Sequence, residues 1–276
     1  MSTAPTTSTA TTAPTTVGAR TGGLVNTTLL RLELRRVLRD RATIFFTTAL
    51  PGFFYLIFGA SQDYSDEPLG NGNVAMMIMV SMAAYGAVTA TVSIGGAAAL
   101  ERMQGWGRQL GLTPLRDATY VVTKALVAVI VAAMPIALVF ALGAVSGARA
   151  DALAWVLSAL VVLVGAAVFA LYGLCFGLAF RSEAALSAAS GSIVVLGFLG
   201  NIFVPLSGLL LDVARFTPLY GYVTLARHPV TEGLVVTGSD GTRTESIWIA
   251  VANVGGWTLL LAVLATLLVR RGRSRQ

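Results

Sequence analysis

The feature that most constrains this chain is a series of apolar runs, each long enough to cross a lipid bilayer as a helix. Of its 276 residues, 55% are hydrophobic and 12% are charged, whereas a soluble domain carries about 25% charged residues. A membrane-spanning helix needs about 20 apolar residues. A membrane β-barrel would instead show alternating segments of about 10 residues, which the sequence lacks. The sequence therefore predicts an all-α integral membrane protein.

We expect six transmembrane helices, and the distribution of arginines predicts their orientation. The expected spans are residues 42–60, 73–100, 118–142, 152–180, 185–206 and 246–269. Arginines cluster before the first span, between the second and third, and after the sixth, whereas the first external loop, 61–72, contains three acids and no base. Basic clusters mark the cytoplasmic side. The excess of Lys+Arg (19) over Asp+Glu (13) is thus a topology signal rather than a nucleic-acid signal. We expect both termini in the cytoplasm and the chain in the cytoplasmic (inner) membrane.

The region before the first span divides into two parts. Residues 1–22 are rich in Thr, Ser, Ala and Pro and lack the apolar core of a signal peptide, so we expect a disordered tail before a transmembrane domain at 23–276. Residues 24–40 place leucines roughly on one helix face. Four arginines lie largely on the other face: Arg31, Arg35, Arg36 and Arg39. This pattern predicts an interfacial helix on the bilayer surface. The alternative is a solvated helix end that only obeys the topology rule.

A polar segment, ERMQGWGRQLGLTPLRD at 101–117, separates the second and third spans. The predicted topology places it in the cytoplasm. Its glycines, including Gly105, permit close backbone contact, and Pro114 restricts the backbone before the third span. We expect this segment to be a surface on which a soluble partner pushes, with a plain cytoplasmic loop as the alternative.

The segment at 207–245, between the fifth and sixth spans, is half apolar but interrupted by Pro218 and Pro229. It is too short and too broken to span. We expect a pair of short re-entrant helices in the outer leaflet, since irregular backbone at that depth must be packed in protein or line a cavity.

Several kinds of site are missing from the sequence. There is no G-x-x-x-x-G-K-[ST] motif, and the single lysine, Lys124, lies at the start of the third span. The chain therefore has no visible nucleotide site of its own. The spans' interiors contain almost no charged residues, which argues against an ion-coupled carrier. A lone His228, a lone Cys175 and scattered acids offer no metal site, cofactor site or catalytic constellation. We expect no enzymatic activity in this chain and an external source of energy.

Three residues are candidates for a substrate path, and each has a structural alternative. Tyr55 could instead belong to the aromatic belt, and Met77 could pack against neighbouring helices. Asn201 could form a bond between helices, because a buried amide needs partners.

The Gly173–Gly177 pair has the G-x-x-x-G spacing of a close-packing helix face.

The chain resembles the membrane subunit of ABC-2-type (type V) ATP-binding-cassette exporters, which include bacterial antibiotic and multidrug-resistance permeases. The likeness begins with the amphipathic helix before the first span. The polar segment is similar to the family's E-R-x-x-G-x-x-x-x-L-x-x-T-P-L motif, matched by Glu101, Arg102, Gly105, Leu110, Thr113, Pro114 and Leu115. The stretch after the fifth span is similar to P-L-S-x-L-P … P-L-x-Y-x-x-x-x-R, matched by Pro205, Leu206, Ser207, Pro218, Leu219, Tyr220 and Arg227.

The resemblance implies a function and partners. A separate ATP-binding-cassette ATPase would bind ATP and dock on the polar segment, where Arg108 joins the matched residues as a coupling candidate. A second permease copy, identical or similar, would complete the path through the bilayer. The implied cargo is an amphipathic small molecule such as an antibiotic. Export of lipid or lipid-linked polysaccharide, and a non-transporting sensor or assembly module, remain alternatives.

Overall fold

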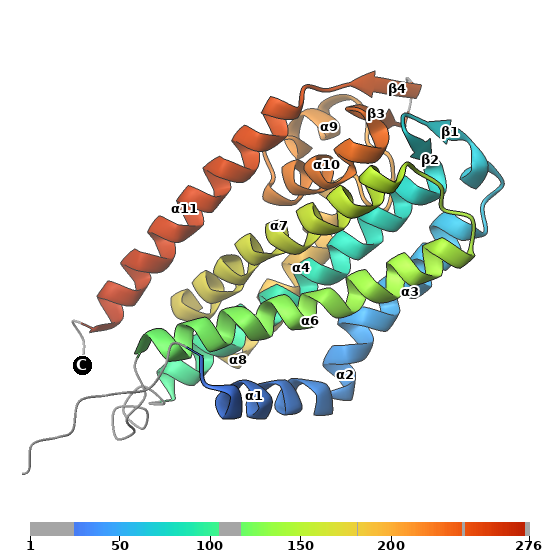
Figure 1. The fold of residues 1–276 in the computed structure, drawn as a ribbon. Helices are drawn as coiled ribbons and strands as arrows, with labels where there is room; N and C mark the ends of the chain where they lie inside the picture. The colour runs from blue at the N-terminus through green and yellow to red at the C-terminus, as the bar shows by residue number, and fades with distance from the viewer. Residues whose placement is uncertain (1–24, 105–116, 181, 239–240, 274–276) are drawn as a thin grey trace, which may run out of the picture.

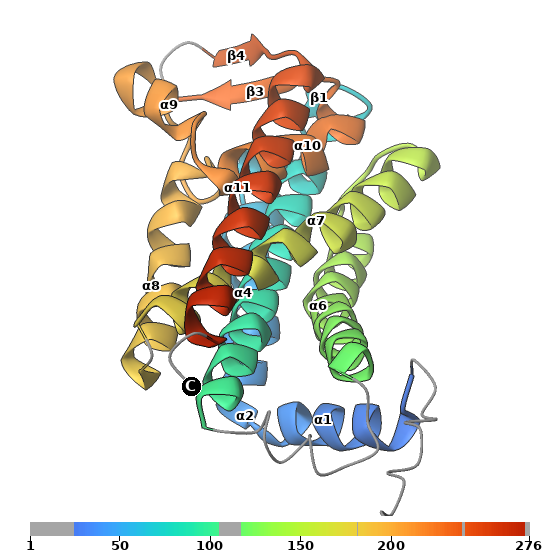
Figure 2. The ribbon, with the colours of Figure 1, turned by 90° about the vertical axis from the view of Figure 1, so that its left-hand side faces the viewer.

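The computed structural model describes residues 25–104, 117–180, 182–238 and 241–273, and shows a helical bundle with one helix lying across its end (Figures 1 and 2). The predicted all-α class is confirmed as mostly helical. The crosswise helix and the C-terminal end of the last helix lie at one end of the bundle, which we call the α1 end. Two small β-hairpins lie at the other, which we call the hairpin end (Figure 1). The predicted tail at 1–22 falls outside the described residues.

The N-terminal elements are a short amphipathic helix and an irregular first span. Helix α1 (Thr27–Arg39) is capped by Asn26, whose side chain accepts from the Leu29 N–H. Helix α2 (Arg41–Ile44) leads into the π-helical η1 (Phe45–Ala49), α3 (Leu50–Tyr55) and the π-helical η2 (Leu56–Ala60). A proline in α3, Pro51, has no N–H to donate to the preceding turn, which accounts for the widened η1 turn before it.

Asp40 separates the crosswise helix from the first span. Its Oδ1 accepts a 3.1 Å bond from the Thr43 N–H and its Oδ2 accepts a 2.6 Å bond from the Thr43 hydroxyl. Both bonds lower the pKa of Asp40, and the bond from the Thr43 hydroxyl has the larger effect. The cap starts α2 in a new direction, because the backbone of Asp40 itself is not helical.

Long helices form the rest of the bundle. They are α4 (Val74–Met103), α6 (Asp117–Val145), α7 (Ala152–Phe180) and α11 (Ile247–Arg273). Together with residues 41–60 they are the five helices, among the described residues, that are long and apolar enough to cross a membrane. The expected span at 185–206 is instead the shorter helix α8 (Glu183–Leu199), 17 residues or about 25 Å long. Six full-length spans are therefore not established, and the boundary at 206 was wrong.

The end of α8 is determined by a local turn. Asn201 has a positive φ of 54°, and the Ile202 N–H bonds the Gly197 carbonyl. This turn ends the helix before the predicted boundary at residue 206, so Asn201 lies in a turn and not within a span.

The hairpin end contains two helices and two strand pairs. Helices α9 (Gly208–Ala214) and α10 (Pro218–Thr231) confirm that two short helices form in this segment. Around them are η3 (Asp63–Asp66), β1 (Pro68–Leu69), β2 (Gly72–Asn73), β3 (Leu234–Thr237) and β4 (Gly241–Thr244). β1 pairs with β2 and β3 with β4, both antiparallel. These hairpins were not predicted from the sequence.

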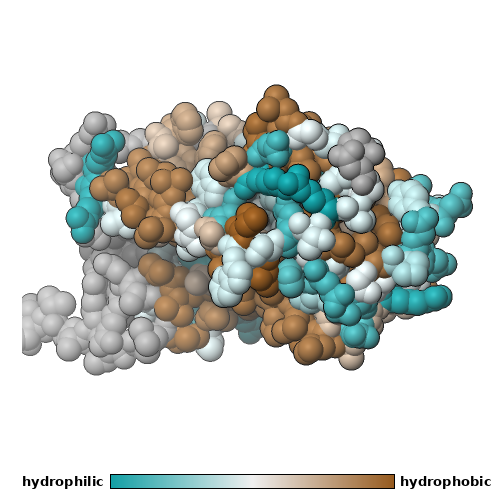
Figure 3. All heavy atoms as spheres, turned by 90° about the horizontal axis from the view of Figure 1, so that it is seen from above, coloured by the Kyte–Doolittle hydropathy of each residue, from teal (hydrophilic) through white to brown (hydrophobic). Residues whose placement is uncertain are grey.

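Helix α4 is the centre of the bundle. In its most apolar stretch 83% of residues are buried within the chain, against 11% for α11. It packs against α6, α7, α8 and α10, and the largest core cluster is built around its residues. Apolar side chains are exposed along the flanks of the molecule (Figure 3), as expected for surfaces that meet lipid or another subunit.

The contact between α4 and α7 depends on glycine. A Cβ on Gly173 would lie 2.1 Å from the Val92 carbonyl oxygen, and one on Gly177 would lie 2.5 Å from the Ala99 Cβ. On the facing helix, a Cβ on Gly95 would lie 2.0 Å from the Ala170 oxygen. The predicted close-packing face at Gly173–Gly177 is thus confirmed.

We expect Gly173→Ala to destabilise the fold by about 3 kcal/mol, because one methyl group would force α4 and α7 apart. Gly255→Ala is the matched control, since a Cβ there meets nothing within 4 Å and alanine favours a helix by up to about 1 kcal/mol. Thermal unfolding of both variants in detergent measures the difference. Equal midpoints would show that the close approach is not required.

Candidate functional site

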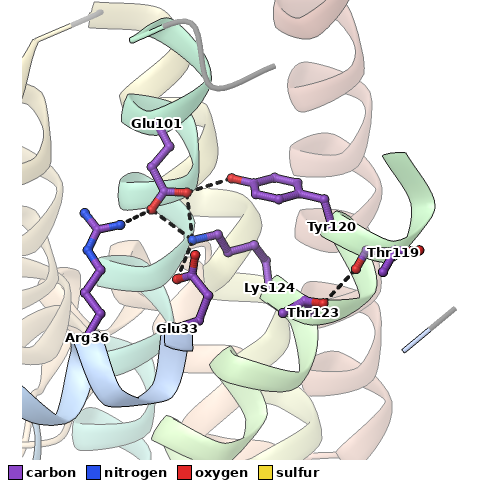
Figure 4. A network of polar contacts seen from close by, with 7 residues as sticks. All are labelled: Glu33, Arg36, Glu101, Thr119, Tyr120, Thr123 and Lys124. Carbon is purple, nitrogen blue, oxygen red and sulfur yellow. Dashed lines mark hydrogen bonds and ion pairs between the residues drawn. The ribbon is translucent and has the colours of Figure 1, made fainter. Parts of the chain in front are cut away.

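A cluster of charged side chains lies where α1, α4 and α6 meet at the α1 end (Figure 4). Its members come from three helices far apart in the sequence. They are Glu33 and Arg36 on α1, Glu101 on α4, and Tyr120 and Lys124 on α6. We call this group the ionic cluster.

Glu101 is the centre of the ionic cluster. Its Oε1 accepts a 2.7 Å bond from Arg36 Nη1, and its Oε2 accepts a 2.8 Å bond from the Tyr120 hydroxyl. Lys124 Nζ lies 2.7 Å from the same Oε2 and 2.8 Å from Glu33 Oε2. One ammonium thus joins a carboxylate of α1 to a carboxylate of α4.

The cluster is electrically balanced and mostly shielded from water. It contains two carboxylates and two cations. The Glu101, Glu33 and Lys124 side chains are 5%, 8% and 11% exposed, whereas that of Arg36 is 63% exposed. Removing one member of such a buried pair leaves an uncompensated charge, at a cost of about 3–5 kcal/mol. The exposed Arg36 contributes about 0–1 kcal/mol.

Helix periodicity and apolar packing place these groups together. Glu33 and Arg36 are three residues apart on α1, and Tyr120 and Lys124 are four apart on α6, so each pair shares a helix face. Leu30, Leu34 and Val37 of α1 pack against a buried group from α4 and α6: Ala90, Ile94, Val127, Ala128 and Val131. Burial of this apolar strip holds α1 against both helices and so aligns the charges.

The ionic cluster lies at the base of the predicted coupling segment. Helix α4 ends at Met103 and α6 begins at Asp117, so the cluster holds both ends of the connection. The candidates Gly105, Arg108, Leu110, Thr113, Pro114 and Leu115 lie outside the described residues. Of the two remaining candidates, Arg102 is exposed, while Glu101 is 4% exposed and bonded within the chain. Glu101 is therefore placed to hold the segment's base rather than to meet a partner directly.

Glu33, Tyr120 and Lys124 were not predicted as site residues from the sequence. Two signals were present. Lys124 is the single lysine of the chain, and Glu33 is an acid on the apolar side of an otherwise basic helix. Among the predicted interfacial arginines, Arg31, Arg35 and Arg39 are exposed, and only Arg36 joins the cluster.

The three candidates for a substrate path are buried within the chain. Tyr55 is fully buried and its hydroxyl lies 2.8 Å from Ser146 Oγ. Met77 is 8% exposed in α4. Asn201 donates a 3.1 Å bond to the Val236 carbonyl and accepts a 2.8 Å bond from the Leu206 N–H. Its amide therefore braces the turn after α8, and does not bond another helix.

The predicted external residues lie on and around α10. Pro218 occupies the first turn of α10, and Ser207 is the N-cap of α9. Pro205 lies in the irregular stretch between α8 and α9. Arg227 is 8% exposed; its Nε donates a 2.6 Å bond to Ser81 Oγ of α4 and its Nη2 a 2.8 Å bond to the Asn201 carbonyl. Arg227 thus ties α10 to α4 and to the turn after α8.

A second ionic contact lies at the hairpin end. Arg215 bonds the buried Glu245, which also accepts a 2.8 Å bond from the Tyr220 hydroxyl. Burial, and then the Glu245 carboxylate, raise the pKa of Tyr220 to about 12. This contact joins the end of α9 and the start of α10 to Glu245, two residues before α11.

Tyr220 predicts an alkaline limit to stability. The pKa of Tyr220 in the folded chain lies above the ordinary value of 10.0. Its contribution to the free energy of unfolding is therefore complete below about pH 10 and is lost as the pH rises through about 12. The tyrosinate absorbance of the chain minus that of Tyr220→Phe should isolate this titration. Glu245→Gln should lower the pKa of Tyr220, because the carboxylate no longer opposes ionisation. An unchanged titration would contradict the contact.

The ionic cluster predicts a non-additive pair of substitutions. Lys124→Met should destabilise the chain by about 3–5 kcal/mol, because two buried carboxylates lose their shared cation. Adding Glu33→Gln should recover part of this loss, since Glu101 and Arg36 then remain as a balanced pair. A double-mutant cycle on unfolding in detergent measures the coupling. Additive losses would show that Lys124 and Glu33 do not interact.

Comparison with known proteins places this arrangement in a family. The chain is 24% identical over 197 residues to "Putative transport permease YvfS" of Bacillus subtilis (strain 168), an alignment covering 69% of this chain and 79% of that protein. The profile of the ABC-2 type transporter family matches residues 26–228, which include α1, the ionic cluster and most of α10. The chain therefore belongs to the ABC-2 type transporter family and is a transmembrane transport permease.

Proposed function

We propose that this chain is the membrane subunit of an ATP-driven exporter, and that the ionic cluster transmits the work of a separate ATP-binding-cassette ATPase to the spans. The observation that carries the proposal is that Lys124 and Glu101 tie the crosswise helix α1 to both ends of the 105–116 connection. A partner pushing on that connection or on α1 would move the two helices together.

Helix α4 would transmit this movement to the hairpin end. Glu101 lies in its last turn and Ser81 lies 20 residues earlier, about 30 Å along the helix. Ser81 accepts the bond from the buried Arg227 of α10. A shift of α4 would therefore reposition α10.

The orientation, partners and cargo follow from the same proposal. The α1 end, which carries Arg31, Arg35, Arg36, Arg39, Arg270 and Arg271, would face the cytoplasm. The ATPase would dock there. The exposed apolar flanks would meet lipid and a second permease copy. Helix α11 is exposed over most of its surface, since only 11% of its most apolar stretch is buried within the chain. An amphipathic small molecule is the cargo most compatible with spans that carry so few charges.

The proposal is tested in vesicles that contain the permease and its ATPase. The folded variant Glu33→Gln/Lys124→Met should retain ATP hydrolysis but lose transport at least about tenfold, because α1 is no longer tied to α6. Arg243→Gln, an exposed change in β4, is the control. Unaltered transport by the folded double variant would overturn the role of the ionic cluster. Transport driven by an ion gradient without the ATPase would overturn the exporter class.

A further inference from the structure

A groove of about 510 Å³ runs along the side of α1 that faces away from the ionic cluster. One wall is a row of leucines spaced four residues apart, Leu30, Leu34 and Leu38. The other wall is a row of arginines at the same spacing, Arg31, Arg35 and Arg39. Residues four apart lie one above the other on a helix, so each row is continuous along α1. The groove therefore has an apolar wall and a cationic wall.

The positive charge of this groove is not neutralised by the acids of the same helix region. Glu33 points to the bundle and is bonded to Lys124. Asp40 is bonded to Thr43. Within the part of the chain that the structure describes, none of the three groove arginines forms an ion pair, and all three are exposed. An anionic group in the groove would meet uncompensated charge.

The position of α1 decides what kind of anion fits. Leu30 and Leu34 also pack against the buried cluster of α4 and α6 that includes Ile94 and Val127. These two residues lie seven positions, about two helical turns, inside the spans from Glu101 and Tyr120. The leucine wall therefore lies on the membrane side of α1, and the arginine wall turns outward from the bundle. Leu38 is 52% exposed on this side. The two walls thus match the boundary between acyl chains and headgroups.

We propose that this groove binds one anionic phospholipid of the membrane. Arg31 and Arg35 contact the phosphate, which guanidinium groups can hold with paired hydrogen bonds. The upper part of an acyl chain lies against Leu34 and Leu38 beside the bundle. The opposite face of α1 carries Glu33 and Arg36, so lipid and ionic cluster would be bound by one rigid helix. This site does not depend on the identity of the cargo or on the ATPase.

The test uses the full-length permease alone, purified in a neutral detergent and mixed with phosphatidylglycerol or phosphatidylcholine. Native mass spectrometry counts the retained lipid. Phosphatidylglycerol should be retained in preference to phosphatidylcholine, and Arg31→Gln/Arg35→Gln should weaken its binding on the order of thirtyfold, as expected when two arginines near an anionic lipid are lost. Arg243→Gln/Arg270→Gln removes the same charge from two other exposed positions and should leave binding unchanged.

A second variant tests the apolar wall. Leu38→Ser should weaken binding of long-chain phosphatidylglycerol more than binding of a short-chain form, because it removes the contact with the chain and leaves the arginines intact. Circular dichroism and thermal unfolding confirm that both variants fold.

Three results would overturn the proposal. The first is equal retention of phosphatidylglycerol by the chain and by Arg31→Gln/Arg35→Gln. The second is an equal loss in the control pair, which would indicate only a dependence on net charge. The third comes from a parallel binding assay with the ATPase subunit: unchanged lipid retention by Arg31→Gln/Arg35→Gln together with weaker binding of that subunit would assign the arginine row to a protein partner.

Discussion

The structure depends on the close approach of α4 and α7, which buries α4 on nearly all sides. Glycines on both helices leave room for the facing backbone, with Gly173 against the Val92 carbonyl and Gly95 against that of Ala170. In a bilayer, where lipid is as apolar as leucine, such close packing replaces the hydrophobic effect as the force between helices. Because α4 is enclosed, it cannot move without repacking α6, α7 and α10.

Polar side chains join α4 to neighbouring helices towards both of its ends. At the α1 end, Glu101 bonds Arg36, Tyr120 and Lys124. Towards the hairpin end, Ser81 receives the Arg227 guanidinium. Each contact joins α4 to a short helix that does not cross the bundle, α1 in the first case and α10 in the second. A central rigid helix with polar attachments at both ends is the arrangement expected of a part that carries movement across a membrane protein.

The crosswise helix α1 combines three roles on three faces. Its apolar strip packs on α4 and α6, Glu33 and Arg36 enter the ionic cluster, and the outward groove pairs leucines with exposed arginines. A single amphipathic pattern would serve a helix that only rests on a bilayer. The acid at Glu33 is the exception to that pattern, and it is the residue that brings α1 into contact with Lys124. The outward groove, the apolar strip and the ionic cluster are thus joined by one helix, so a movement of α1 would move all three.

By itself the sequence determined the helical membrane class, four of the long spans nearly to their ends, the N-terminal amphipathic helix and the two short helices α9 and α10, because hydropathy and proline act locally. Its polar composition between two apolar runs also located the segment at 101–117. Tertiary structure decided what these patterns could not. Helix α8 ends early at the turn of Asn201, and two hairpins form at the hairpin end. The side chains of Asn201 and Tyr55 form hydrogen bonds within the chain. Tertiary structure also joined Glu33, Glu101 and Lys124, residues 23 to 91 positions apart in pairs. Nothing local indicates that such distant charges meet. Only the packing of α1 on α4 and α6 brings them within bonding distance and excludes the water that would otherwise screen them.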